Sequence, residues 1–128
     1  MALSDQEELE KILKRLEVNV PEIEAAAVVS LDGLTLASAL PADTDEDRVA
    51  AMAAAMQSLG EKVSEELKRG SLEQLFIRGK EGFTFICQAG PEGVLTVLAR
   101  KEAKLGLVFL EVKRASSDVA KILSPQGA

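Results

Sequence analysis

The sequence contains no histidine and a single cysteine, Cys87. Ser-His-Asp triads, Cys-His dyads and histidine general bases therefore cannot form, and the usual zinc sites lack their ligands. Cys87 has no partner for an internal disulfide, and its position in an apolar, strand-like segment predicts a buried thiol in a reducing compartment. We expect a protein that is not an enzyme and that holds no metal or other cofactor.

The sequence also lacks an excess of positive charge and a long hydrophobic run. Its net charge of −6 repels nucleic-acid phosphates and anionic lipid headgroups, so neither is an expected partner. No apolar run approaches the roughly 20 residues that span a bilayer, and acidic residues follow Met1 where a signal peptide would be basic and then apolar. These features predict a cytoplasmic protein without membrane insertion.

The residues that are present have the composition of a folded domain. Of 128 residues, 47% are hydrophobic and 28% are charged. A chain of this length can bury one core but has no room for two. We therefore predict a single domain over residues 1–128.

Apolar spacing and turn residues predict the order of helices and strands. Ser4 and Glu7 form a capping box, Asp32-Gly33 predicts a type I′ hairpin turn, and Gly70 is the expected C-cap of a long helix. The predicted elements are a helix at 4–17, strands at 25–31 and 34–40, a helix after 43–47 that reaches 69, strands at 71–78, 82–89 and 94–100, and a helix at 105–123. The order is α-β-β-α-β-β-β-α, and the short turns predict antiparallel strands.

The long central helix has two apolar sides where a helix on a sheet needs one. Larger side chains follow one stripe, which we expect to pack on the sheet: Val49, Met52, Ala53, Met56, Leu59, Gly60, Val63 and Leu67. Small side chains form the opposite side: Ala50, Ala51, Ala54, Ala55 and Ser58. The small side predicts close contact with the same helix of a second subunit, and the alternative is that alanine merely favours the helix.

The strand predicted at residues 71–78 supports the same contact. Leu72, Leu75, Phe76 and Ile77 make it too apolar for an unprotected sheet edge. Pairing with its symmetry mate would cover that edge. We therefore assign these four residues, together with the small side of the central helix, to a homodimer interface.

Motifs that resemble ligand sites have simpler explanations. Asp43, Asp45 and Asp47 alternate as in a calcium loop, but Arg48 stands where the loop's glycine belongs and Ala54 where its glutamate belongs. The acidic cluster suits a helix N-terminus, with Thr44 and Asp47 as caps. The segment 79–82 lacks P-loop spacing and is interpreted as a hairpin turn.

Two groups of residues in the last third of the chain are assigned to surface or packing roles. Arg78, Arg100 and Arg114 are interpreted as solvated residues and not as arginine fingers. Leu107 and Leu110 project away from the main stripe of the last helix. We expect them to contact the first helix, with a partner contact as the alternative.

The sequence resembles the roadblock / dynein light-chain family in its predicted order of elements, in the segments 28–37 and 75–79, and in Leu105-Gly106-Leu107 at the start of the last helix. The resemblance covers nearly the whole chain and is strongest to small prokaryotic members, similar to bacterial GTPase-regulating polarity proteins. It implies a five-stranded antiparallel α+β sheet with the first and last helices on one face and the central helix on the other. It also implies dimerisation, no active site, and partnership with a Ras-like small GTPase.

These inferences lead to two functional hypotheses. The first is a non-enzymatic homodimeric regulator or scaffold that binds a Ras-like GTPase and modulates its nucleotide state or location. Its GTPase contacts are placed at Asp45, Asp47, Arg48 and Lys62. The alternative is a small-molecule sensor, or an adaptor subunit of a larger signalling or motor assembly.

Overall fold

The computed structural model describes residues 4–124, so the two ends of the predicted 1–128 domain lie outside the described residues. The elements are α1 (Asp5–Asn19), β1 (Ile23–Ser30), β2 (Thr35–Ala39), α2 (Glu46–Glu66), β3 (Leu75–Gly79), β4 (Gly82–Gln88), β5 (Gly93–Arg100) and α3 (Leu105–Leu123). The predicted order α-β-β-α-β-β-β-α is confirmed.

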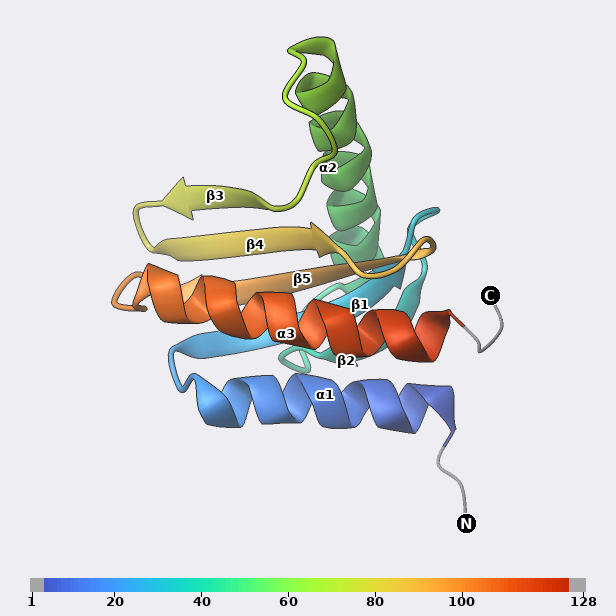
Figure 1. Cartoon of the computed structure of the whole chain (residues 1–128). Helices are drawn as coiled ribbons and strands as arrows, with labels where there is room; N and C mark the ends of the chain where they lie inside the picture. The colour runs from blue at the N-terminus through green and yellow to red at the C-terminus, as the bar shows by residue number, and fades with distance from the viewer. Residues whose placement is uncertain (1–3, 125–128) are drawn as a thin grey trace.

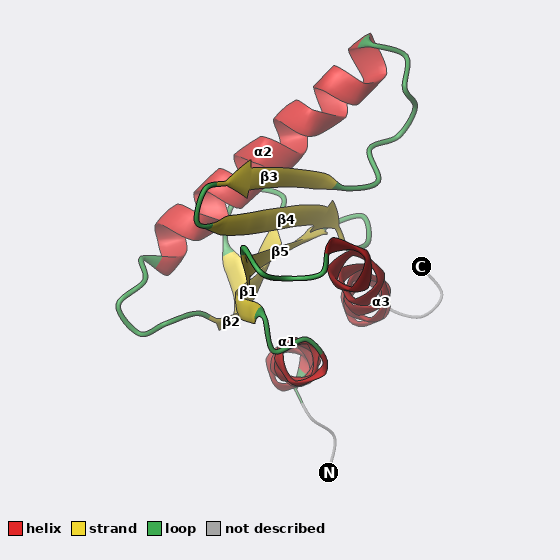
Figure 2. Cartoon of the chain, turned by 90° about the vertical axis from the view of Figure 1, so that its left-hand side faces the viewer, coloured by secondary structure: helices red, strands yellow, loops and turns green. Residues whose placement is uncertain are grey.

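The strands form one antiparallel sheet in the order β2-β1-β5-β4-β3. Helices α1 and α3 lie side by side on one face, and α2 crosses the other face (Figure 1, Figure 2). This confirms the fold class and the layering that the family resemblance implied. The outer strands are β2 and β3, so each has one edge without a neighbour in the sheet.

The N-terminal ends of α1 and α2 are set by local hydrogen bonds. Ser4 caps α1 in the predicted box, with its side chain accepting from the Glu7 backbone N–H while the Glu7 carboxylate accepts from the Ser4 backbone N–H. Asp45, and not the predicted Thr44 or Asp47, caps α2 by accepting from the Arg48 N–H at 3.2 Å. The capping function therefore falls in the predicted acidic cluster but on a different residue.

The C-terminal end of α2 differs from the prediction. The helix ends at Glu66, because Lys68 adopts a φ of +58° and the Arg69 N–H donates to the Ser64 carbonyl at 2.7 Å. Together with the bond from Lys68 N–H to the Glu65 carbonyl, this is a Schellman motif. Gly70 also has a positive φ, of 88°, but it follows a helix that has already ended.

Two further boundaries were predicted wrongly. Four residues, 31–34, separate β1 from β2, the Ser30 N–H donates to the Leu34 carbonyl, and Gly33 is the one residue among them with a positive φ. The predicted two-residue type I′ turn is therefore absent. Strand β3 begins at Leu75 and not at 71, which leaves Leu72 in the connector, where its side chain packs against Gly60 of α2.

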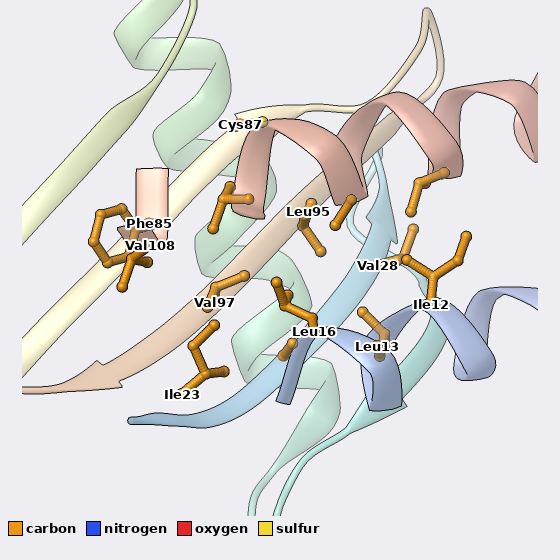
Figure 3. Packing of buried hydrophobic residues seen from close by; sticks show 14 of the residues in the cluster. Ile12, Leu13, Leu16, Ile23, Val28, Phe85, Cys87, Leu95, Val97 and Val108 are labelled. Atoms are coloured by element: carbon orange, nitrogen blue, oxygen red, sulfur yellow. The ribbon is translucent and has the colours of Figure 1, made fainter. Parts of the chain in front are cut away.

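The larger hydrophobic core lies between the sheet and the α1–α3 layer. Side chains from both helices meet those of β1, β4 and β5 there, including the fully buried Leu13, Val28 and Val108 (Figure 3). Leu107 and Leu110 do not belong to this core and are 40% and 47% exposed, so their expected contact with the first helix stays a prediction.

One carboxyl group is held in a partly buried position on α1. Oε2 of Glu17 is buried and has no hydrogen-bond partner among the described residues. Burial raises the pKa of this carboxyl above its ordinary value, because the charged form loses solvation. The charged form therefore opposes folding at neutral pH.

We predict that Glu17→Gln stabilises the protein at pH 7, by less than about 1 kcal/mol because the carboxyl is still partly solvated. The gain should be complete above the raised folded-state pKa and should vanish below the unfolded-state pKa, where both states are protonated. Urea unfolding at several pH values measures this. The exposed Glu24→Gln should show no such pH-dependent gain, and an equal gain for both variants would contradict the prediction.

The Cys87 thiol is buried, as the sequence predicted, and is 4% exposed. Burial raises its pKa, which lowers the thiolate fraction and the reactivity. We predict that a thiol reagent labels native protein roughly a hundredfold or more slowly than unfolded protein, since a stable fold rarely opens. Labelling with and without denaturant measures the ratio, and a native rate near the unfolded rate would show an open strand β4.

Candidate self-association surface

Helix α2 faces its own sheet with small side chains. Ala50, Ala53 and Ala54 are 0%, 3% and 7% exposed, and Gln57 is 1% exposed with its amide Nε2 donating to Glu61 Oε1 at 3.0 Å. Ala50 and Ala53 join a second, smaller core on this face of the sheet. Ala50 and Ala54 are thus covered by their own chain and do not present side chains to a partner, which corrects their assignment to the interface.

Several larger apolar side chains of α2 and of its C-cap residue Leu67 are exposed. Met52, Leu59, Val63 and Leu67 are 54%, 57%, 50% and 62% exposed. The expectation that this stripe packs on the sheet is therefore wrong for these four residues. Ala53 and, in part, Met56 do pack there.

Helix length explains the exposure in the C-terminal part of α2. The 21 residues of α2 span about 31 Å, whereas five strands span only about 19 Å from the first axis to the last. The helix runs across the strands, and its C-terminal part extends beyond β3 (Figure 1). No sheet lies beneath that part, so Leu59 and Val63 remain exposed. The predicted helix length contained this signal, which reasoning from periodicity alone missed.

An apolar groove of about 470 Å³ lies beside α2 on the part of the sheet that the helix leaves uncovered. It is lined by Val49, Met52, Ala53, Ala55 and Met56 from the helix and by Ile77, Thr84, Ile86, Thr96 and Leu98 from the sheet. A second hollow of about 320 Å³ lies between the C-terminal half of α2 and the connector to β3. Its lining includes Leu59, Val63 and Leu72. The exposed apolar side chains of α2 therefore lie next to the apolar groove.

Strand β3 forms the rim of this region and is paired only with β4. Ile77 is 44% exposed and lines the groove on the α2 side. Phe76 points to the other face, where its ring lies 5.9 Å from that of Phe85 and 5.4 Å from that of Phe109. The assigned strand residues are thus divided between the two faces of the sheet.

The structure also shows where the other residues assigned to the dimer interface and to GTPase contact lie. Ala51, Ala55 and Ser58 are exposed on α2, while Leu72 and Leu75 are half-buried beside it. The residues assigned to GTPase contact are all exposed: Asp45, Asp47, Arg48 and Lys62. They do not form one cluster, because Lys62 lies 14 positions after Arg48, which corresponds to about 21 Å of helix.

The chemistry available at this surface is the burial of apolar groups. Among residues 4–124, no three or more histidine, cysteine, aspartate or glutamate side chains are grouped so that they could hold a metal ion. Over the same residues, none of the helices combines the length and the hydrophobicity needed to cross a bilayer. A large, contiguous apolar surface on a folded chain is typical of a protein interface.

Comparison with known proteins identifies the family. The Roadblock/LC7 domain matches residues 8–99. The uncharacterized protein MJ0310 of Methanocaldococcus jannaschii is 41% identical over 105 residues, which cover 81% of this chain and 91% of that protein. A Roadblock/LC7 domain from Streptomyces avermitilis superposes with a TM-score of 0.84 at 25% identity, covering 91% of this chain and 98% of that one. Myxococcus xanthus MglB shares the fold, with a TM-score of 0.84 at 21% identity over 96% and 92% of the two chains. The chain therefore belongs to the Roadblock/LC7 domain family.

Proposed function

We propose that this protein is a cytoplasmic homodimer that binds a Ras-like small GTPase and modulates its nucleotide state or location, without an active site of its own. The observation that carries the proposal is the exposed apolar side of α2, formed by Met52, Leu59 and Val63, beside an apolar groove. Leaving this surface in water is unfavourable, so it favours a protein that acts by association.

A second copy of the same chain suits this surface because the surface is self-complementary. The projecting side chains and the groove that would receive them are neighbours on one molecule. A two-fold axis between them would let each copy place its α2 in the groove of the other. The same axis would bring the two β3 strands together, so that each covers the other's unpaired edge. Ala55 lines the groove and would lie in this contact, whereas Ala51 and Ser58 would lie at its margin.

Family membership supports the GTPase part of the proposal, because the resemblance to prokaryotic members of the family implies a Ras-like GTPase as partner. Dimerisation would place two copies of α2 side by side, each carrying the exposed Asp45, Asp47, Arg48 and Lys62. Such a composite surface can regulate a GTPase by holding its switch segments in one arrangement, which needs no catalytic group on the regulator. The small-molecule alternative has less support. A specific ligand site usually directs several polar groups at its ligand, whereas the groove has only two polar lining residues, Thr84 and Thr96.

We predict a mass of about twice 13.6 kDa by sedimentation equilibrium. Leu59→Glu with Val63→Glu should weaken dimerisation roughly a hundredfold or more, because two charges would be buried at the centre of the contact. Both sites are exposed in the single chain, so circular dichroism should show an unchanged fold.

The matched control is Ser58→Glu, which adds a charge to the exposed small side of the same helix. It should leave the dimer intact if the large apolar side forms the contact. Dissociation by Ser58→Glu, with no effect of the Leu59 and Val63 changes, would return the contact to the alanine side. A wild-type monomer at high concentration would contradict the dimer itself.

We further predict that affinity-tagged protein recovers a Ras-like GTPase from the source cell, identified by mass spectrometry. The purified pair should show a changed rate of nucleotide exchange or hydrolysis, or a changed location of the GTPase in the cell. Asp47→Lys with Arg48→Glu should weaken recovery about tenfold while the dimer persists, because these exposed charges lie outside the apolar seam. A stable dimer that neither binds the GTPase nor alters it would leave the self-association intact and remove the proposed partner.

A further inference from the structure

A group of cations lies at one end of the sheet, away from the groove beside α2. Arg78 and Lys80 belong to the end of β3 and the β3–β4 turn, and Lys101 and Lys104 belong to the β5–α3 turn. We call these four residues the basic patch. All four are exposed, in a protein whose net charge is −6.

Three residues of the basic patch line a hollow of about 520 Å³. Arg78, Lys80 and Lys101 line this hollow together with Gly79 and Phe83. Phe83 supplies an aromatic wall, and the Arg78 guanidinium lies 5.9 Å from the centre of its ring. The Phe83 ring belongs to the core on the α3 side of the sheet, so the hollow opens on the face opposite α2. The lining of the hollow combines several positive groups with an apolar surface.

None of the four cations of the basic patch forms an ion pair within the described residues. The ion pairs among residues 4–124 are Arg15–Asp118 and Arg114–Glu111, and neither involves a residue of the basic patch. Glu81 and Glu102 occupy the same two turns but form no ion pair with it, and the first turn of α3 contains no acidic residue. The four cations and the two carboxylates together give these turns a net charge of +2, so the local charge is positive although the protein as a whole is negative.

Exposed apolar side chains continue from the basic patch. Phe76, two residues before Arg78 on the same face of β3, is 43% exposed. Leu107 and Leu110 on the first turns of α3 are 40% and 47% exposed. A free small anion would use the cations alone and leave these side chains in water. A peptide segment could use both groups.

We propose that the basic patch, with Phe76, Leu107 and Leu110 at its border, is a docking surface for a short acidic segment of a partner protein that also carries apolar side chains. Charge complementarity selects this occupant. A nucleic-acid duplex or a lipid surface extends over the whole molecule and meets its net charge of −6. A short segment meets only the local positive field, because salt screens charges beyond about 8 Å.

This surface shares strand β3 with the proposed dimer contact but lies on the other face of the sheet from α2. The apolar groove opens on the α2 side of the sheet, and the hollow of the basic patch opens on the α3 side. Both surfaces can therefore be occupied at once. Each copy in a dimer would carry one patch, so the dimer would connect two acidic segments to whatever binds α2.

The test uses a short fluorescein-labelled peptide of glutamate and leucine residues, titrated with full-length protein and followed by anisotropy and backbone NMR shifts. Binding should shift the amides of the two turns, at 78–82 and 101–107. Lys80→Glu with Lys101→Glu should weaken binding about tenfold or more, since two favourable charge pairs become repulsive. Lys11→Glu with Lys14→Glu is the matched control. It reverses two exposed lysines of α1 and should leave the affinity unchanged.

Three further measurements decide the chemistry of the occupant. A peptide with serine in place of leucine should bind more weakly, and a lysine–leucine peptide should not bind. Equal binding of inorganic tripolyphosphate, or tighter binding of vesicles containing anionic lipid, would overturn the acidic-segment proposal in favour of a general anion site or a membrane surface. Shifts confined to α2, or equal losses in the patch and control variants, would also overturn it. None of these outcomes depends on dimerisation or on GTPase recovery.

Discussion

Helix α2 packs on its sheet through small side chains, with Ala50 and Ala53 joining Ala27 and Val29 of β1 in the smaller core. Small groups on both surfaces let the helix approach closely, and the close contact gains dispersion energy over its length. Of the larger side chains, Gln57 is buried and Met56 packs in part on the smaller core, whereas Met52, Leu59 and Val63 remain exposed. The exposed apolar surface of α2 is a result of this packing.

The two faces of the sheet therefore have different roles. The α1–α3 face encloses the larger core, in which Phe85 makes edge-to-face contact with Phe109 at 5.1 Å and most side chains are fully covered. The α2 face is only partly covered, because one helix crosses it. Stability comes mainly from the covered face, and the uncovered face is available for binding.

Local signals predicted the fold correctly where a few neighbouring residues decide it. Ser4 and Glu7 satisfy one another's backbone groups, so their spacing alone predicts the start of α1. The end of α2 was harder, because Lys68 adopts the left-handed conformation that glycine normally favours and Gly70 only follows it. The start of β3 was also missed. Leu72 is apolar enough for a strand, but it packs on Gly60 of the helix before it.

Composition and periodicity by themselves determined the order of elements, the strand pairing through short turns, the absence of imidazole chemistry and the buried state of Cys87. These properties depend on residue type and on near neighbours. Only the tertiary structure decided which side of α2 is free, which face Phe76 points to, and that cations from two separate turns meet around Phe83. Periodicity shows that a helix has two sides, but the helix's position and length relative to the sheet determine which of them is covered.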